Sequence, residues 1–430
     1  MERIRKILIL GSGGIQAINI LCENLLRFGD FKYQFSGINL YNPGKGGITT
    51  NYDHIDDLYE IYPETSIRNI SRGLIIKYLK KKFTLIRFIE LVFQKRFKYR
   101  LIRRHIIDTI KEADYRFRIL NKISEYEVVN VHYLSEWQSE IVPLIPENIW
   151  VVITPWGSDV MATAGPKTYA LQYEAMQRAN AITVTGPETE QIVLSKFGRN
   201  LKSKIHYTFI GLSENTVNSL RSEKERYLDI GNSLLKRFNK NASDYKYIIK
   251  LGYSAYETQN HIAILNEMSK LPGGILSNLL FIIPMTYGEF SEGYKEKVEQ
   301  CLIEKTLNGI VLKDYLASEE AVSLSFISNI MFNLRDNDSF NNSMTESLIA
   351  GAVVFNGIWL PYKILKQKNV HYIDVYNING MSVLFEEIIS DFESHKKKSL
   401  MNAGILEGFI SGKGNVENWE KALYKVQIHE

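Results

Sequence analysis

Residues 330–355, IMFNLRDNDSFNNSMTESLIAGAVVF, decide the fold class of this chain. The apolar run Ile330–Leu334 predicts a buried strand, and Ser343–Ala350 has the composition of a short helix. Gly351 ends that helix, and Ala352–Phe355 predicts a second buried strand. Short apolar strands that alternate with helices are typical of a parallel sheet with helices on both faces.

The same alternation runs through most of the chain, in two halves. The first half extends from a strand at Lys6–Leu10 to one at Lys204–Phe209, and the second begins with a strand at Tyr247. A polar stretch joins the halves, and the amphipathic segment Val416–Val426 closes the chain. This pattern predicts an α/β fold of two doubly wound, Rossmann-like domains. We expect a first domain, a linker, a second domain and a helix that crosses back to the first domain, at residues 1–212, 213–246, 247–412 and 413–430.

The composition indicates a large folded protein and excludes several classes. Of the 430 residues, 45% are hydrophobic and 23% are charged, so disordered and collagen-like chains are excluded. With only two cysteines, Cys22 and Cys301, a disulfide scaffold and a cysteine-ligated metal site are not expected. The sequence shows no secretory signal and no run of about 18 apolar residues, so we expect a cytoplasmic protein.

Positive charge is concentrated in one segment. Residues 71–105 contain twelve Lys and Arg and one acidic residue, whereas acidic residues outnumber basic ones in the remainder. Apolar residues recur every three or four positions over Ile75–Leu101, which predicts a basic amphipathic helix within a helical insertion at 66–120. Such a helix suits an anionic membrane surface, and a core helix with a solvated basic face is the alternative. The residues expected at the membrane are Lys80, Lys81, Lys82, Arg87, Lys95 and Arg96. No RNA or DNA motif accompanies the charge, so nucleic acid is not an expected partner.

Two acids frame the helix of the opening segment. Asp338 lies in the loop after the strand, and Glu346 lies one turn inside the helix. Asn342 or Ser343 can cap the helix, whose first N–H groups attract an anion such as a diphosphate. The Glu346 carboxylate can accept hydrogen bonds from a ribose diol. An ordinary helix with an acidic cap is the alternative.

This order of acid, seven residues, acid, helix, glycine and strand resembles the E-x7-E motif of family-4 glycosyltransferases, with aspartate in the first position. The resemblance implies the GT-B fold, in which two Rossmann-like domains face a cleft that holds the ligands. It also implies that Asp338 contacts the donor sugar, that Glu346, Asn342 and Ser343 bind the nucleotide, and that the sugar retains its anomeric configuration. No metal or other cofactor is expected, because a helix terminus and side chains can stabilise the leaving diphosphate.

The first strand-to-helix turn of the second half carries a further resemblance. The sequence Lys250–His261, KLGYSAYETQNH, is similar to a pattern in transferases that extend lipid-linked bacterial glycans, and so is Pro284–Gly288. By this resemblance Gly252, Tyr253 and Tyr287 bind the donor. Family-4 enzymes also place an Arg and a Lys at this turn to hold the diphosphate, and neither is present here. The candidates to replace them are Arg335, Lys313 and His261.

In the first half, polar side chains follow two strands. His132 ends one strand, and Trp156-Gly157-Ser158-Asp159 follows the next. The pair resembles the acceptor side of family-4 transferases, so we expect His132 and Asp159 to be catalytic and Trp156 to line the acceptor loop. A structural role is equally open for His132, and Asp159 can simply cap the following turn.

A glycine-rich turn, Gly11-Ser12-Gly13-Gly14, follows the first strand. It departs from the G-x-G-x-x-G dinucleotide fingerprint, because Gln16 occupies the third glycine position and no acid ends the second strand. We expect Gly13 and Gly14 to let the acceptor or the diphosphate approach the sheet edge, and a packing turn is the alternative.

These features together predict a hexosyltransferase-like enzyme, peripheral on the inner face of the cytoplasmic membrane. It would move a sugar from a UDP-, GDP- or dTDP-sugar to a hydroxyl of a lipid-linked glycan in surface polysaccharide synthesis. Two alternatives stay open. One is a GT-B sugar-nucleotide epimerase, and the other is a non-catalytic membrane-bound scaffold, which the missing Arg and Lys would suit.

Overall fold

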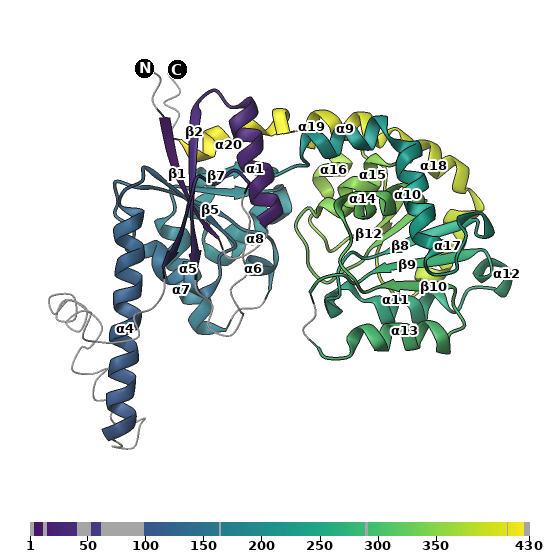
Figure 1. The fold of residues 1–430 in the computed structure, drawn as a ribbon, viewed down its shortest axis with the longest axis horizontal. Coiled ribbons are helices and arrows are strands. Elements are labelled where there is room, and N and C mark those ends of the chain that lie inside the picture. The colour runs from purple at the N-terminus through teal and green to yellow at the C-terminus, as the bar shows by residue number, and fades with distance from the viewer. Residues whose placement is uncertain are drawn as a thin grey trace.

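The computed structural model describes residues 4–11, 15–40, 53–61, 99–162, 165–288, 291–410 and 412–424. The described chain forms two α/β domains, each built on one parallel sheet (Figure 1). The predicted class of two doubly wound domains is therefore confirmed.

The first domain contains a seven-stranded sheet in the order β3-β2-β1-β4-β5-β6-β7. Alternate residues of β1 enter two cores, because Ile7 and Ile9 pack on one face of the sheet and Leu8 and Leu10 on the other. Burial on both faces explains why Ile7–Leu10 of this strand are all apolar. The strands are β1 (Ile4–Gly11), β2 (Lys32–Leu40), β3 (Asp57–Ile61), β4 (Val128–His132), β5 (Trp150–Thr154), β6 (Ala181–Val184) and β7 (Ile205–Tyr207). The helices are α1 (Ile15–Phe28), α4 (Tyr99–Ile123), α5 (Glu136–Ile141), α6 (Ser158–Met161), α7 (Pro166–Arg178) and α8 (Pro187–Phe197).

The second domain contains a six-stranded sheet in the order β10-β9-β8-β11-β12-β13. Its strands are β8 (Tyr247–Leu251), β9 (Leu279–Pro284), β10 (Gly309–Leu312), β11 (Ile330–Asn333), β12 (Val353–Gly357) and β13 (Ile373–Val375). Its helices are α11 (His261–Met268), α12 (Gly273–Leu276), α13 (Tyr294–Glu304), α14 (Ser318–Ile327), α15 (Asn342–Ile349), α16 (Lys363–Gln367), α17 (Met381–Ser390), α18 (Phe392–Leu400) and α19 (Asn402–Ile410).

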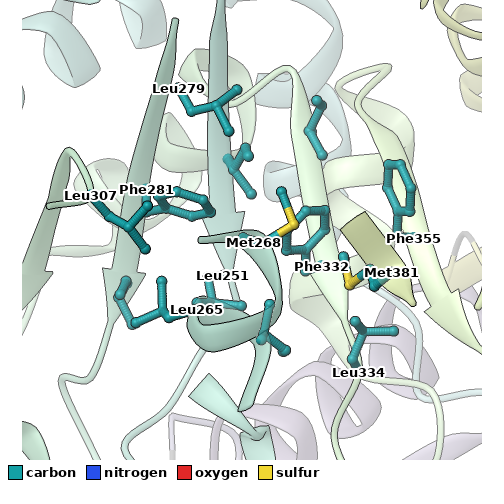
Figure 2. Packing of buried hydrophobic residues seen from close by; sticks show 14 of the residues in the cluster. Leu251, Leu265, Met268, Leu279, Phe281, Leu307, Phe332, Leu334, Phe355 and Met381 are labelled. Atoms are coloured by element: carbon teal, nitrogen blue, oxygen red, sulfur yellow. The ribbon is translucent and has the colours of Figure 1, made fainter. Parts of the chain in front are cut away.

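One face of the second sheet packs against α11, α13 and α17. Figure 2 shows Leu251, Phe281 and Phe332 from three neighbouring strands, with Leu265 and Met268 of α11 against them. The side chains of a strand alternate between faces, so the residues of β8 that flank these positions point to the opposite side, toward α14 and the helix Lys224–Lys236 (α10). This alternation places Lys250 on the α14 side of the sheet.

The expected linker, residues 213–246, forms α9 (Glu214–Ser222) and α10 (Lys224–Lys236). Leu234 and Leu235 of α10 are buried with Ile248 and Leu280 of the second sheet. The core of the second domain therefore includes a helix from the predicted linker, because α10 carries an apolar stripe inside its polar sequence.

The last helix, α20 (Gly412–Leu423), packs against α1 and the first sheet (Figure 1). The indole N–H of Trp419 donates to the Phe209 carbonyl at 2.7 Å, and that of Trp150 donates to the Ala422 carbonyl at 2.9 Å. Chain segments from both ends of the sequence thus complete the first domain.

Two groups of predicted residues lie outside the described residues: Gly13 and Gly14, and the six basic residues assigned to the membrane. Helix α4, which follows that basic stretch, extends away from the first sheet in Figure 1. Among the described helices, none combines the length and the apolar character needed to cross a bilayer.

Candidate functional site

The strand order reverses at one place in each sheet. The reversal lies between β1 and β4 in the first sheet and between β8 and β11 in the second. Gly11 pairs with His132 at the first reversal, and Leu251 pairs with Phe332 at the second. Open parallel sheets bind ligands outside the carboxyl ends of their strands, next to such a reversal. The loops that follow these strands are therefore the candidate site.

The carboxyl-end loops of the two domains touch each other. Thr185 Oγ1, after β6, lies 3.0 Å from Ser339 Oγ, in the loop after β11. Gly157, after β5, lies so close to Ser339 that an added β-carbon would come within 2.8 Å of the serine β-carbon. The backbone N–H of Lys363 donates to Glu188 Oε1 at 3.1 Å. Loop 335–341 of the second domain thus meets the loops after β5 and β6 of the first.

The Asp159 carboxylate fastens two loops of the first domain together. It accepts hydrogen bonds from the backbone N–H of Leu134 at 2.8 Å and of Trp156 at 2.9 Å. Burial raises its pKa, and the backbone donors oppose that rise. Both carboxylate oxygens accept from backbone N–H groups, so Asp159 helps to fix the conformation of the loop that carries Trp156.

His132 is wholly buried at the end of β4. The indole N–H of Trp156 donates to Nδ1 at 3.3 Å, and Nε2 lies 2.9 Å from the side-chain amide nitrogen of Asn130. The ring also stacks on Trp419 of α20, with ring centroids 6.4 Å apart. Burial lowers the His132 pKa to about 3, so the imidazole is neutral near pH 7. Among the described residues, Trp156 is the one that links the His132 ring to the loop at the domain interface.

Asp338 lies in the second-domain loop that meets the first domain, and it is 8% exposed. Its carboxylate accepts hydrogen bonds from the Tyr362 hydroxyl at 2.7 Å, from the Ser339 backbone N–H at 2.9 Å and from the Asn341 side chain. Each carboxylate oxygen can accept more than one hydrogen bond, so a sugar hydroxyl can still be bound. The network fixes the carboxylate beside the interface.

Arg335 places a cation in the same loop. One of its terminal nitrogens donates to the Tyr253 hydroxyl and lies 3.8 Å from Asp338 Oδ1, and its guanidinium lies 5.5 Å from the centre of the Tyr253 ring. Its Nε is buried and has no hydrogen-bond partner among the described residues. Burying a donor without an acceptor costs about 1–3 kcal/mol, so this side chain is suited to receive an anion.

The other two candidates for a diphosphate-binding cation are placed differently. Lys313 Nζ pairs with Glu296 at 2.9 Å and Glu299 at 2.8 Å, so α13 already neutralises it. His261 is wholly buried, and burial lowers its pKa to about 4. Of the three candidates, Arg335 alone stands in the loop that faces the first domain.

Helix α15 begins directly after this loop. Its N-cap is Asn341, whose side-chain oxygen accepts from the Met344 N–H at 2.6 Å. The expectation that Asn342 or Ser343 caps the helix is therefore wrong, because the chain enters the helix one residue earlier. Asn342 and Ser343 instead form its first turn, where backbone N–H groups lack intrahelical partners.

Glu346 lies one turn into α15 and is partly buried. Burial raises its pKa to about 6, and Lys250 acts in the opposite direction. Lys250 is 2% exposed, and burial lowers its pKa to about 8, with Glu346 opposing. The acidic side chain of Glu346 and the basic side chain of Lys250 therefore interact near the start of α15.

The loop after β8 has a backbone conformation that requires a glycine at its first residue. Gly252 has φ +67°, and an added β-carbon there would lie 2.8 Å from Gln259 Oε1, so only glycine fits. Tyr253 lies beneath the Arg335 guanidinium, and Tyr287 is 52% exposed after β9. The structure thus brings Tyr253 and Arg335 together.

Two bulky residues in the loops at the carboxyl ends of the strands have left-handed backbone conformations. Tyr133 has φ 62° directly after β4, and Phe340 has φ 63° in the loop after β11. The Phe340 ring packs against Phe209 and Tyr362, with centroids 4.6 and 5.5 Å away. Such conformations cost about 1–3 kcal/mol each and are concentrated at functional sites.

Sequence reasoning missed Lys250, Asn341 and Tyr362. A lysine inside the apolar run Tyr247–Leu251 was the available signal for the first. Nothing in the sequence showed that the Tyr362 hydroxyl meets Asp338, because the two residues come from loops after different strands.

No protein-family model matches the sequence, and no curated protein is found to be similar to it. Solved structures do match it. The Anabaena protein HepE in complex with UDP has a TM-score of 0.67 at 10% identity and covers 98% of this chain and 100% of its own. The Candida albicans trehalose-6-phosphate phosphatase N-terminal domain has 0.66 at 12%, covering 98% and 99%. A Rickettsia africae glycosyltransferase has 0.66 at 13%, covering 100% of both.

The chain has the GT-B fold. Both Rossmann-like sheets and the helix that returns to the first domain belong to one full-length match, so the predicted fold class is confirmed. At these identities the likeness establishes the GT-B fold and not the reaction. Family 4, in particular, stays a prediction.

Proposed function

We propose that this protein is a glycosyltransferase that moves a sugar from a nucleotide-sugar to a hydroxyl acceptor. The observation that carries the proposal is the grouping of Arg335, Asp338 and Glu346 around the start of α15, at the strand reversal of the second sheet. HepE, which shares the fold, binds UDP and UDP-glucose, which supports a donor of this class.

The donor would lie along the second domain. Arg335 and the first N–H groups of α15 would hold the diphosphate, because a guanidinium and a helix N-terminus both favour an anion. Glu346 would accept hydrogen bonds from the ribose hydroxyls, and Asp338 from the sugar. Gly252 would let the backbone approach the phosphates, with Tyr253 and Tyr287 beside them.

The reaction breaks the bond between the sugar anomeric carbon and the diphosphate oxygen, and forms one from that carbon to the acceptor oxygen. The nucleoside diphosphate leaves with the extra negative charge, which Arg335 and the helix terminus stabilise. The acceptor proton would pass to the departing diphosphate, since each ring nitrogen of the buried His132 already lies against a side chain, that of Trp156 or Asn130, in the described part of the chain. This route fits a retaining hexosyltransferase.

The acceptor would approach from the first domain, along Trp156, Asp159 and the glycine turn at Gly13 and Gly14. The basic stretch at 71–105 supports a lipid-linked glycan as acceptor, presented at an anionic membrane on its cytoplasmic face. A place in surface polysaccharide synthesis follows from that choice of acceptor.

The first test is calorimetry of the purified protein with UDP, GDP and dTDP, followed by turnover of the matching nucleotide-sugars. We expect one nucleoside diphosphate to bind, and the nucleotide-sugar to be consumed only when a glycan acceptor is supplied. Conversion of the nucleotide-sugar to an isomer without acceptor would identify an epimerase. Binding of none of the three would favour a non-catalytic scaffold and reject the proposal.

A further inference from the structure

Lys250 is a lysine in the middle of the second sheet. It follows Ile248 on the face of β8 that packs toward α14, and it is 2% exposed. An ammonium ion at such a depth loses its hydration, which costs several kcal/mol unless partners replace the water. A side chain needed only for packing would be apolar there, as Ile248 is.

Within the described part of the chain, the ammonium group of Lys250 has two hydrogen-bond partners, and both belong to helices over the sheet. It donates to Ser325 Oγ of α14 at 2.9 Å and to the Ser343 carbonyl, in the first turn of α15, at 3.3 Å. Glu346 follows Ser343 by three positions and so lies on the same side of α15. The lysine therefore stands beneath the turn that carries the proposed ribose ligand.

Few ionisable side chains of the described residues lie near Glu346. Among the described residues, Lys250 of β8 and the Tyr287 hydroxyl after β9 interact electrostatically with it. Helix α14 presents Ser325 here, and β11 and β12 contain no ionisable residue. Lys396 of α18 donates to the Gly351 carbonyl, past the far end of α15, while Arg335 and Asp338 precede its start. The one ionisable residue of α19 is Glu407. In the part of the chain that the structure describes, Lys250 is thus the cation that interacts electrostatically with Glu346, and it contacts the turn of α15 that precedes this acid.

We propose that Lys250 is a positioning residue of the nucleotide site, which keeps Glu346 ionised and holds the first turn of α15 in place. This inference rests on the proposed function, because Glu346 matters as a carboxylate only if it accepts hydrogen bonds from a ribose. Lys250 would supply, from inside the domain, a positive charge that stabilises the site without contacting the ligand.

The test compares wild type with Lys250→Met and Lys250→Arg in calorimetric titrations with the nucleoside diphosphate that wild type binds. The titrations run from pH 5.5 to 8.5. Wild-type affinity should fall as the pH drops through the Glu346 pKa, near 6. Loss of the neighbouring cation should raise the midpoint of this fall by about one pH unit in Lys250→Met, and Lys250→Arg should restore it. In a Glu346→Gln background, Lys250→Met should leave the pH profile unchanged.

Two results separate the inference from the proposed function. If wild type binds nucleotide with a midpoint and Lys250→Met keeps that midpoint, Lys250 has a packing role only and the inference is overturned. If wild type binds no nucleotide at any pH, the proposed function fails and the inference fails with it. Lys250→Gln, which keeps a polar side chain of similar length, replaces Lys250→Met should the methionine variant not fold.

Discussion

The indole N–H of Trp156 donates to Nδ1 of His132 at 3.3 Å, and this bond joins the end of β4 to the interface loop after β5. The histidine below is wholly buried, and its other ring nitrogen faces Asn130. We therefore replace the catalytic role expected for His132 with a hypothesis about Trp156. His132 orients the indole ring through this hydrogen bond, and the indole contacts the substrate.

Replacing His132 with Phe removes this hydrogen bond and keeps a ring in place. Turnover should fall about tenfold, the scale of one hydrogen bond, while nucleotide affinity stays unchanged. Trp156→Phe removes the same bond from the other side, so the double variant should be no worse than the single ones. Steady-state kinetics and calorimetry measure these effects.

The pH profile gives an independent check on His132. Its pKa near 3 leaves the ring neutral from pH 5 to 9, so no limb of the wild-type pH–rate profile in that range should belong to it. Loss of a limb in His132→Phe would show that His132 takes a proton from the acceptor, contrary to the buried arrangement.

Asp338 should act through its charge. Asp338→Asn should lower turnover by at least 100-fold, about 2.7 kcal/mol of transition-state stabilisation, and leave nucleotide affinity within a factor of about three. Tyr362→Phe is the matched control, because it removes the 2.7 Å hydrogen bond and keeps the carboxylate. Its turnover should fall much less. Equal losses in the two variants would mean that the network, and not the charge, is what matters.

Arg335 should contribute to the binding of the phosphates of the ligand, and little to the binding of its nucleoside. Arg335→Met should weaken nucleoside diphosphate binding by about 1.5–3 kcal/mol and weaken binding of the unphosphorylated nucleoside little, because the lost interaction is a charge-assisted hydrogen bond. Lys313→Met serves as control, since that lysine pairs with Glu296 and Glu299 on α13. If Lys313→Met removes diphosphate affinity and Arg335→Met does not, the cation has been assigned to the wrong loop.

Glu346 should make the site prefer a ribonucleotide over its 2′-deoxy form. Glu346→Gln should weaken ribonucleotide binding by about 1–3 kcal/mol. It should also shrink the preference for the ribonucleotide over its 2′-deoxy form, which lacks one hydroxyl. Calorimetry with both ligands, on wild type and variant, measures the change. A folded variant with wild-type affinity for both would remove Glu346 from the site.

The sequence predicted most strands of the two sheets, because a strand that is buried on both faces reads as a short apolar run between helices. It did not predict the edge strand β3, whose residues Asp57, Leu58 and Tyr59 are exposed or partly exposed. Ile330–Asn333 and Val353–Gly357 lie where the apolar runs predict them. Helix α10 was harder to place. Its buried face consists of few residues within a polar stretch, and only contact with β8 and β9 shows that it belongs to the second core.

The candidate site was partly predictable. Arg335, Asp338 and Glu346 sit on one continuous segment, so a local motif could place them together. Lys250 and Ser343 lie 93 positions apart, and a strand sequence does not show which helix covers it. Likewise, the burial of His132 depends on Trp419, which arrives from the other end of the chain. Contacts between distant segments set the environment of these groups, and local patterns do not contain them.

The basic stretch at 71–105 yields the last prediction. Twelve basic residues against one acidic residue, in a chain whose remainder is acidic, should draw this segment to an anionic bilayer. Replacing Lys80, Lys81, Lys82, Lys95 and Arg96 with Gln removes five charges, on the order of 5 kcal/mol of attraction. Wild type should co-sediment with phosphatidylserine vesicles at low salt and dissociate as salt shortens the screening length, whereas the variant should stay in the supernatant.

A matched control is available in α18, where Lys397→Gln with Lys398→Gln removes adjacent charges from the second domain. This variant should bind vesicles as wild type does, because its charges do not belong to the basic stretch. Nucleotide binding should survive in both variants, since the donor site is proposed in the second domain, around α15. If wild type ignores the vesicles at low salt, the basic stretch packs within the protein. The acceptor would then be a soluble glycan, and the transferase would act away from the membrane.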